Sequence, residues 1–516
     1  MNLWIGGNFF MEHVDSENRR RKLTKSLKPS WVFAIALGSS VGWGAFILPG
    51  DWIAQSGPVG AMIGLLIGAI IMMIIASSYG VMIKKFPVSG GGFTNAFISA
   101  GKIWAFVCGW FLSLGYISIV ALNASAFSLL LKYLIPGFMK QYYLYSVAGW
   151  DVYLPEVIIS SLLIITFALL NSLGTSFSGR LQFYFVVLLI GGVVLLGGLT
   201  FGFADQPFEN MKPVFKSEQS VFVSILLILA IAPWAYVGFD NVPQAAEEFE
   251  FSPRKATLLI VFSLLTSFLI YAVMIGLTSW TFPDVTGMGD GALWLTGDVI
   301  FNLLGTVGLV VMAIAIMMGI FTGLNGFYMS ASRLLFSMAR ARALPNMFRK
   351  MTKNQIPIWG IWFVTLITLP TPWLGREALN WIVDMSSTGV SVGYFFTCLA
   401  AYKLLAWKAE EQGREIDPVK KALALIGIVC SLIFIGLLLI PVSPAALTGP
   451  SYILLVVWGI VGIGFYFVMR KRYNSLTAEE TEYYVLGKTI DSEAVVEYDE
   501  EAEEHNEPSS SPAFMK

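Results

Sequence analysis

The sequence predicts an all-α integral membrane protein with twelve transmembrane helices. Of its 516 residues, 56% are hydrophobic and 13% are charged, and the mean hydropathy is +0.70. This composition is typical of a chain that crosses a membrane many times. Twelve apolar stretches are each long enough to span a bilayer, which takes about 20 helical residues. They are residues 31–55, 58–83, 103–131, 152–171, 179–203, 219–246, 256–281, 298–326, 357–373, 377–402, 421–441 and 449–469.

The Lys and Arg residues support this number of spans. With the N-terminus in the cytoplasm, 28 of the 33 basic residues fall in cytoplasmic segments. The others are Lys132, Lys140, Lys212, Lys216 and Arg376. Cytoplasmic loops carry an excess of Lys and Arg, and one span more or fewer would remove the asymmetry. We therefore predict a multi-pass protein of the plasma (inner) membrane with both termini in the cytoplasm.

The chain divides into three parts. Residues 1–29 form a basic cytoplasmic arm, residues 30–472 hold the twelve spans, and residues 473–516 form an acidic cytoplasmic tail. Twelve carboxylates follow Leu476, and no apolar periodicity continues after Leu486. A segment of this kind is predicted to be disordered, either as a solubilising end or as a regulatory tail.

Cysteine and histidine usage excludes several kinds of site. The three cysteines, Cys108, Cys398 and Cys430, lie far apart within spans, so they predict neither a disulfide nor a metal framework. The two histidines, His13 and His505, lie outside the membrane. Because no nucleophile–base pair is recognisable in the spans, we do not expect an enzyme. We expect no cofactor, no metal site and no nucleic-acid partner, and we expect no cleavable signal peptide.

The first apolar stretch is interrupted in its middle. It contains Gly38, Ser39, Ser40, Val41, Gly42, Trp43 and Gly44, and Pro49 follows shortly after. Glycine removes the side chain and proline removes a backbone donor, so the helix is expected to break here. In lipid, broken backbone is tolerated only where it faces protein or a cavity.

The sixth stretch contains a second interruption. Pro233, Gly238 and Pro243 surround Asp240 within an otherwise apolar segment. One such break alone is most simply a kink. Two breaks with polar residues, separated by several spans, indicate a transporter's binding site at the middle of the membrane.

The two breaks predict the chemistry of that site. Amide groups at a helix N-terminus suit a carboxylate, and unwound carbonyls suit an ammonium group or a cation. We expect the amides of Gly42, Trp43 and Gly44 to bind a carboxylate. Carbonyls in two short segments would hold the amine: Ser39 and Ser40 in the first span, and Trp234, Ala235, Tyr236 and Val237 in the sixth.

Three motifs in these spans resemble those of amino acid–polyamine–organocation permeases. The first span has GWGAF, similar to the family's G-x-G-[IV]-F but with a bulky Trp43 between the glycines. The sixth has Phe239 and Asp240 followed by AAEE and SPRKA, and the eighth has NGFYMSASRLLFSMARARALP. Together the motifs cover residues 30 to about 472 in the order and topology of the family.

The resemblance implies a fold and a mechanism. Spans 1–5 and 6–10 would form a five-plus-five inverted repeat with discontinuous helices 1 and 6, and the site would work by alternating access. Some members carry an aromatic gate on the sixth helix with a carboxylate six residues later, a spacing that Trp234 and Asp240 match. The resemblance thus assigns a gate to Trp234 and a coupling carboxylate to Asp240. A helix cap is the alternative role for Asp240.

Other polar residues leave alternatives open. Asp51 and Asp384 could contact a cationic substrate or cap neighbouring backbone. Glu247 and Glu248 lie near Arg254 and Lys255, and Arg333, Arg340 and Arg342 follow the eighth span. Pairs across this surface could close a cytoplasmic gate, although for any one residue the sequence favours solvated charges.

Possible coupling ions are suggested only by the resemblance. Sodium-coupled proteins of this architecture use hydroxyls where Ser330 and Ser332 follow the eighth span. Proton-linked members carry a lysine in the fifth span, where this chain has Leu189. The absence of that lysine leaves coupling by sodium, by protonation of Asp240, or by exchange.

The leading hypothesis is a secondary active transporter that moves an amino acid across the plasma membrane. It would act as a proton- or sodium-coupled symporter or as an exchanger. Trp43 reduces the room for a large aromatic substrate and offers a cation–π face. The alternative is a permease or antiporter for an amine such as ethanolamine or putrescine. A nutrient sensor that binds without transport is a third possibility.

Overall fold

The computed structural model describes residues 20, 22–217, 219–281, 294–375, 377–412, 417–443 and 446–487. Most of the predicted arm (residues 1–19) and of the tail (residues 488–516) lies outside the described residues. The described chain is almost wholly helical, with one two-stranded sheet.

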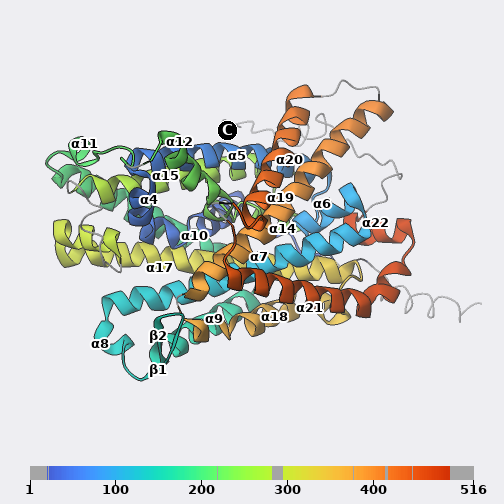
Figure 1. Cartoon of the computed structure of the whole chain (residues 1–516). Helices are drawn as coiled ribbons and strands as arrows, with labels where there is room; N and C mark the ends of the chain where they lie inside the picture. The colour runs from blue at the N-terminus through green and yellow to red at the C-terminus, as the bar shows by residue number, and fades with distance from the viewer. Residues whose placement is uncertain are drawn as a thin grey trace, which may run out of the picture.

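The elements follow one another as a series of long helices joined by short segments (Figure 1). The first half contains α2 (Pro29–Val41), α3 (Gly44–Ile47), α4 (Pro49–Ser56), α5 (Pro58–Lys85), α6 (Gly91–Ala100), α7 (Lys102–Leu134), α8 (Pro136–Met139), β1 (Tyr143–Val147), β2 (Trp150–Tyr153), α9 (Leu154–Ser172), α10 (Thr175–Phe203) and α11 (Pro207–Asn210). The second half contains α12 (Val221–Ala230), α13 (Ala232–Ala235), α14 (Asn241–Gln244), the 3₁₀ turn η1 (Ala246–Glu248), α15 (Pro253–Ser279), α17 (Leu295–Arg340), η2 (Asn346–Arg349), α18 (Ile358–Thr368), η3 (Thr371–Leu374), α19 (Glu377–Gln412), α20 (Pro418–Leu439), α21 (Gly449–Asn474) and α22 (Ala478–Leu486).

Nine helices within the described residues are long and apolar enough to cross a membrane. Three shorter apolar segments, Pro29–Val41, Val221–Ala230 and Ile358–Leu374, fall on the remaining predicted spans 1, 6 and 9. Each predicted stretch therefore contains an apolar helix, and the two interrupted stretches are among the three with short helices. The chain is an all-α, multi-pass membrane protein.

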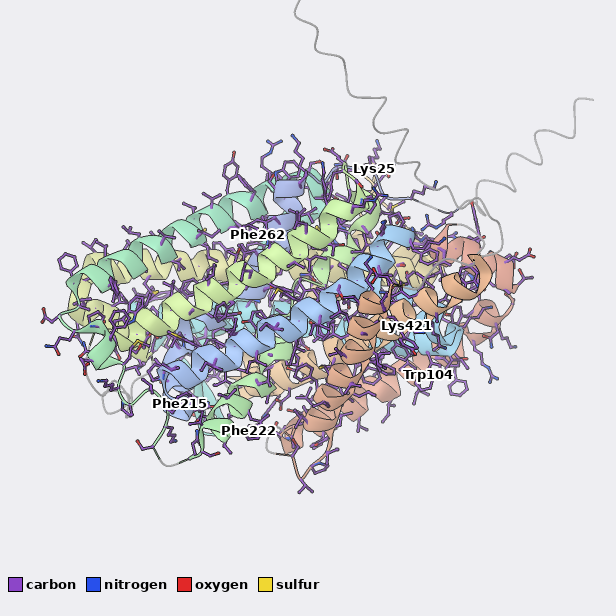
Figure 2. The ribbon with its side chains drawn as sticks, turned by 90° about the horizontal axis from the view of Figure 1, so that it is seen from above. Lys25, Trp104, Phe215, Phe222, Phe262 and Lys421 are labelled. Carbon is purple, nitrogen blue, oxygen red and sulfur yellow. The ribbon has the colours of Figure 1, made fainter. Side chains whose placement is uncertain are left out.

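Large apolar side chains cover the outside of the helix bundle. Figure 2 shows Trp104, Phe222 and Phe262 on this outer surface, where they are 53%, 72% and 56% exposed. Many serines, threonines and tyrosines are instead buried between helices. Apolar residues outside and polar residues inside fit a lipid environment, because lipid, unlike water, does not penalise exposed apolar surface.

The two ends of the bundle differ. At one end, α8 and the antiparallel hairpin of β1 and β2 follow α7, with Val147 paired to Trp150 across the turn (Figure 1). At the other end, α6 and α22 lie together beside the end of α17 (Figure 1). The basic residues between positions 333 and 353, and those at positions 470–472, also lie at this second end.

Helix α17 extends well beyond the predicted eighth span of residues 298–326. It has 46 residues, and Gly305 interrupts its regular geometry with φ 63° and ψ −157°. The helix continues to Arg340 because its polar C-terminal side chains are held by neighbouring elements, which apolarity alone does not reveal.

Part of the tail predicted to be disordered forms helix α22. Its N-terminus has a capping box in which Thr477 and Glu480 bond each other's backbone amides. Tyr484, Val485 and Leu486 are buried at its C-terminal end. The expectation of disorder therefore does not hold for residues 478–486, because capping and docking stabilise a segment that lacks a clear apolar period.

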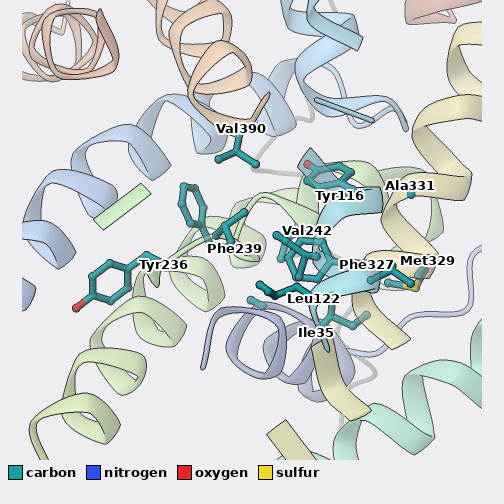
Figure 3. Close-up of a cluster of buried hydrophobic side chains, with 14 of the residues drawn as sticks. Ile35, Tyr116, Leu122, Tyr236, Phe239, Val242, Phe327, Met329, Ala331 and Val390 are labelled. Atoms are coloured by element: carbon teal, nitrogen blue, oxygen red, sulfur yellow. The ribbon is translucent and has the colours of Figure 1, made fainter. Parts of the chain in front are cut away.

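The short pieces of the sixth apolar stretch run through the centre of the bundle. Figure 3 shows Phe239 and Val242 from this stretch among Tyr116, Phe327 and Val390, which come from α7, α17 and α19. Phe239 and Val242 are at most 1% exposed. This packing places the interrupted backbone in the interior rather than against lipid.

Candidate functional site

The first apolar stretch breaks where the glycines predict. Helix α2 ends at Val41, Gly42 adopts φ 49° and ψ −163°, and α3 begins at Gly44. A positive φ of this kind strongly favours glycine. The first residues of the restarted helix have no intrahelical acceptors for their N–H groups, so the break provides free donors.

The sixth stretch breaks around Gly238. Helix α12 ends at Ala230, α13 is a single turn, and α14 begins at Asn241. Gly238 has φ 129°, and a Cβ atom at this position would lie 2.5 Å from the carbonyl carbon of Ser39. The two breaks thus touch each other through backbone that only glycine allows to approach so closely.

Two hydroxyl groups join the breaks. Ser40 donates a hydrogen bond to the carbonyl of Tyr236 at 3.2 Å. The hydroxyl of Tyr271, on α15, lies 2.8 Å from the carbonyl of Ser40 and also bonds the carbonyl of Ala235. Several unwound carbonyls are therefore already satisfied by protein donors.

A small cavity lies where the breaks meet. Its volume is about 30 Å³, which leaves room for about two water molecules, since one needs roughly 10–15 Å³ by the same kind of measure. None of its lining residues carries a charged side chain. They are Ser39, Ser40, Val41, Gly42, Trp43, Gly44, Ile119, Leu122, Asn123, Trp234, Ala235, Val237 and Tyr271.

Two tryptophans limit the size of this cavity. The rings of Trp43 and Trp234 meet edge to face, with centroids 6.1 Å apart. A Cβ atom at Gly44 would lie 2.5 Å from Cη2 of Trp234, so this indole rests directly on the restarted first helix. The indole of Trp234 thus packs between Trp43 and Gly44 at the first break.

The structure brings eight of the nine predicted binding residues to the cavity. Tyr236 is the exception. Its carbonyl, the group predicted to bind the amine, accepts the hydrogen bond from Ser40, and its hydroxyl group donates to the carbonyl of Leu65 on α5 at 2.8 Å. The sequence prediction missed Asn123 and Tyr271, which line the cavity from α7 and α15. Both helices contain several other buried polar side chains, and no sequence signal distinguishes Asn123 or Tyr271 from them.

Asp240 lies behind the cavity rather than in its lining. The side chain is fully buried, and its Oδ2 accepts a hydrogen bond from Tyr116 at 2.7 Å. Its Oδ1 accepts from the amide of Gly238 at 2.9 Å, and Gln244 donates to the Tyr116 hydroxyl at 3.1 Å. The side chain makes no capping bond to α14. The helix-cap alternative does not describe this carboxylate.

Asp384 and Asp51, which the sequence also singled out, lie away from the cavity lining. Asp384 accepts hydrogen bonds from the Thr448 amide at 3.1 Å and from Ser451 at 2.7 Å, so it joins α19 to the start of α21. Asp51 is exposed in the first turn of α4. Of the two roles that the sequence left open for Asp384, the structure shows a bond to nearby backbone, that of Thr448.

Two backbone carbonyls of the first helix accept hydrogen bonds from uncharged side chains of α17 and α10. Thr322 donates to the carbonyl of Gly38 at 2.9 Å, and Gln182 donates to the carbonyl of Ala34 at 3.3 Å. Ser332, suggested by the resemblance for this role, instead lies against Gly360 of α18. Ser330 is fully buried in α17, and no described hydrogen bond joins it to the first helix. Thr322 is a hydroxyl residue of α17 that does bond the first helix. Leu189 is buried in α10.

Acidic residues after the sixth stretch form buried ion pairs. Nη1 of Arg340 lies 2.8 Å from one oxygen of Glu247, and Nη1 of Arg20 lies 2.7 Å from the other. Arg333 pairs with Glu248, and these two side chains are 4% and 2% exposed. The expectation of solvated charges is wrong for all of these residues, because neighbouring helices cover them.

The environment shifts the pKa values of two members of this cluster. Burial raises the pKa of Glu247, but Arg340 and Arg20 outweigh burial and leave it below the ordinary 4.5. Burial, together with repulsion from Arg340, lowers the pKa of Arg20 to about 10 in spite of Glu247. Both groups remain charged at neutral pH, so the cluster is ionic there.

Comparison with known proteins identifies the family of this chain. The family described as "Amino acid permease" matches residues 27–466. The chain is 25% identical to a branched-chain amino acid permease of Lactococcus lactis, over 90% of this chain and 99% of that protein. It is 24% identical to a lysine-specific permease of the same organism, over 86% and 88%. It is 22% identical to a methylthioribose transporter of Bacillus subtilis, over 90% and 98%.

Permeases are transporters rather than enzymes, and the match covers all twelve apolar stretches but the end of the last. The chain belongs to the amino acid permease family of the amino acid–polyamine–organocation superfamily.

Proposed function

We propose that this protein is a secondary transporter that moves an amino acid across the plasma membrane by alternating access. The observation that carries the proposal is the meeting of two interrupted helices at one small cavity. Free backbone groups at membrane depth are costly unless they bind something. In this proposal the chain crosses the membrane twelve times, with a five-plus-five inverted repeat and both termini in the cytoplasm.

The backbone supplies the groups that recognise the substrate. Amides of Gly42, Trp43 and Gly44 bind the α-carboxylate, because they begin the restarted helix. Carbonyls of Ser39 and of the sixth stretch bind the α-ammonium group. Tyr271 holds Ser40 and Ala235 in place for this task and thereby preorganises the site.

The uncharged lining favours an amino acid with a neutral side chain. No lining residue can neutralise a second positive charge, and a buried unpaired charge is strongly disfavoured. The same argument weakens the amine alternative, since Asp51 and Asp384 lie outside the cavity lining. Similar proteins are named for branched-chain amino acids and for lysine. Family membership therefore does not decide which side chain is accepted, and the cavity lining is the guide to it.

The small volume favours a small side chain. Trp43 and Trp234 limit the cavity, so even alanine, with six heavy atoms, requires one of these indoles to move, and a larger side chain requires more movement. Trp234 is the proposed gate. It packs on Gly44 of the first helix but belongs to the sixth stretch, so it can move independently of the first helix.

Coupling through a proton or by exchange fits the contacts better than coupling through sodium. The carbonyls of Gly38 and Ala34 accept hydrogen bonds from Thr322 and Gln182, which satisfies oxygens that a cation would otherwise use. Asp240 is fully buried, and its described contacts are with Tyr116 and Gly238. A carboxylate in this setting is suited to carry a proton.

Reconstituted protein tests the proposal. Proteoliposomes would be assayed for uptake of labelled alanine, with leucine, lysine, ethanolamine and putrescine as competitors. We expect alanine uptake, with competition by leucine stronger than by lysine. Competition by the amines alone would overturn the amino acid assignment.

A binding measurement separates transport from sensing. A ligand that binds only the folded protein raises its melting temperature, so the same compounds would be compared by thermal unfolding in detergent. Stabilisation by alanine together with uptake supports a transporter. Stabilisation without any flux would favour a sensor.

A further inference from the structure

The described part of the N-terminal arm binds along the cytoplasmic end of the bundle. The amides of Ser26 and Leu27 donate to the carbonyl of Glu248 at 2.9 and 2.8 Å, and Leu27 forms a β-bridge with Phe249. Thr24 bonds Gln355 at 2.5 Å. These contacts tie the arm to the segment that follows the sixth stretch.

The C-terminal helix α22 docks on the same end. Lys102 donates to the carbonyl of Leu476 at 2.8 Å just before the helix begins. The guanidinium group of Arg342 lies 5.2 Å from the ring centroid of Tyr484. Val485 is fully buried and Leu486 nearly so. Thus α22 is packed against the body of the protein.

Arg20 joins the arm to α22 and to the ion pairs. Its Nη1 lies 2.7 Å from Glu247, and its Nε donates to the carbonyl of Tyr484 at 3.3 Å. Gly487, the left-handed residue that ends α22, lies close to the same guanidinium group, since a Cβ atom there would be 3.2 Å from Cζ of Arg20. This one side chain of the N-terminal arm therefore contacts both the segment after the sixth stretch and the C-terminal helix α22.

Arg20 can leave the Glu247 carboxylate more readily than Arg340 can. Arg340 makes two contacts of 2.9 and 2.8 Å with the Glu247 carboxylate from the end of α17. Arg20 shares that carboxylate with Arg340, and the repulsion between the two cations opposes its binding. Glu247 keeps a partner when Arg20 leaves, so departure of the arm does not strand a buried carboxylate.

The arm leads directly into the first helix. Only Lys28 separates Leu27 from Pro29, the first residue of α2. Helix α2 cannot swing away from the sixth stretch unless Leu27 leaves Phe249 and Arg20 leaves Glu247. Any contact that holds Arg20 in place therefore also holds α2.

We propose that Arg20 and helix α22 form a latch that keeps the cytoplasmic side closed, with α22 setting how readily the arm is released. The proposal rests on the alternating-access function above. In this proposal the C-terminal helix controls cytoplasmic opening. This role is separate from substrate binding and from the ion pairs that α17 makes.

Cysteine accessibility tests the latch without any substrate. Ser337 is fully buried on α17, where it bonds the carbonyl of Ser89. Cysteine would replace it in a protein whose Cys108, Cys398 and Cys430 are changed to serine. The labelling rate by a maleimide reagent in inside-out vesicles then reports cytoplasmic opening.

Two truncations form a matched pair. Removal of residues 477–516 deletes α22, whereas removal of residues 488–516 leaves it intact. We expect the first to raise the labelling rate on the order of tenfold, since it removes a contact of a buried ion pair, and the second to leave it unchanged. Arg20→Ala should reproduce the effect of the first truncation.

Point variants guard against misfolding and against a general charge effect. Val485→Asp disrupts docking of α22 in a full-length chain and should also raise labelling. Lys25→Ala, at an exposed position of the same arm (Figure 2), should not. Unchanged labelling in Arg20→Ala and Val485→Asp proteins that keep a cooperative thermal transition would overturn the latch. Failure of uptake alone would bear on the proposed transport function instead.

Discussion

The indole of Trp234 lies on Gly44, so close that a Cβ atom at this glycine would come within 2.5 Å of the ring. Replacing Gly44 by alanine must push the indole away or shift the restarted helix. We expect Gly44→Ala to weaken substrate binding about tenfold or more, which corresponds to ~1.4 kcal/mol. Uptake and substrate-induced thermal stabilisation would measure the loss. Gly191→Ala is the control, since that glycine meets nothing within 4 Å. An equal loss in both variants would contradict the prediction.

The size of the site is predicted to depend on Trp43. Its ring is 7% exposed and forms an edge contact with Trp234. Trp43→Ala removes a wall of the cavity, so larger neutral amino acids such as phenylalanine should become competitors of alanine uptake. The measurement is the ratio of inhibition constants for phenylalanine and alanine. A ratio that stays at the wild-type value would place the size limit elsewhere.

The hydroxyl group of Tyr271 is predicted to stabilise both breaks. Tyr271→Phe leaves the carbonyls of Ser40 and Ala235 without this donor, at a cost of about 1–3 kcal/mol for buried polar groups left unsatisfied. We expect a lower melting temperature and weaker uptake. Tyr184→Phe, at a position 58% exposed, should change neither. A stable, fully active Tyr271→Phe protein would contradict a bridging role.

Protonation of Asp240 is predicted to shape the pH dependence of uptake. Asp240→Asn keeps the size of the side chain but cannot gain or lose a proton. If this carboxylate carries the coupling proton, the variant's uptake should be nearly independent of pH between 5 and 8. Asp205→Asn, an exposed change, should retain the wild-type profile. A pH profile unaltered by Asp240→Asn would leave exchange as the coupling mode.

The ion pairs of Glu247 are predicted to survive mild acid. The pKa of this group is lowered in the folded protein by Arg340 and Arg20, which together outweigh burial. Its stabilising effect is therefore fully present above the ordinary pKa of 4.5 and is lost as the pH falls through the lowered value. The difference in melting temperature between wild type and Glu247→Gln should be constant from pH 5 to 8 and shrink below 4.5. A difference that already disappears near pH 6 would contradict this.

Much of the site could be predicted because glycine and proline mark broken helices directly. Gly42 and Gly238 require positive φ values, and their sequence neighbours therefore reach the cavity. Tyr236 does not line the cavity, and its carbonyl accepts a hydrogen bond from Ser40. An irregular backbone has no fixed period from which to predict which carbonyls remain open. Tyr271 could not be predicted, since its role depends on how α15 packs beside the breaks.

The end of the bundle that holds Arg340 and α22 could be predicted only in part. The pairing of Glu247 with Arg340 was one of two alternatives, and composition favoured the wrong one, because burial depends on neighbours distant in sequence. Helix α22 was missed because its stability comes from the Thr477 cap and from three buried residues at its end. Neither produces the long apolar repeat by which helices are recognised.

The length of α17 gives it the properties of a lever. Thr322 contacts the first helix at the level of the break, and Arg340 holds Glu247 eighteen residues further along the same helix. At 1.5 Å per residue this separation is about 27 Å. A tilt of only ~10° about the level of Thr322 would move Arg340 by about 5 Å, enough to separate an ion pair of 2.8 Å. A small displacement of the first helix near the cavity, passed to α17 at Thr322, could therefore become a movement at Arg340 that is large enough to open that end of the bundle.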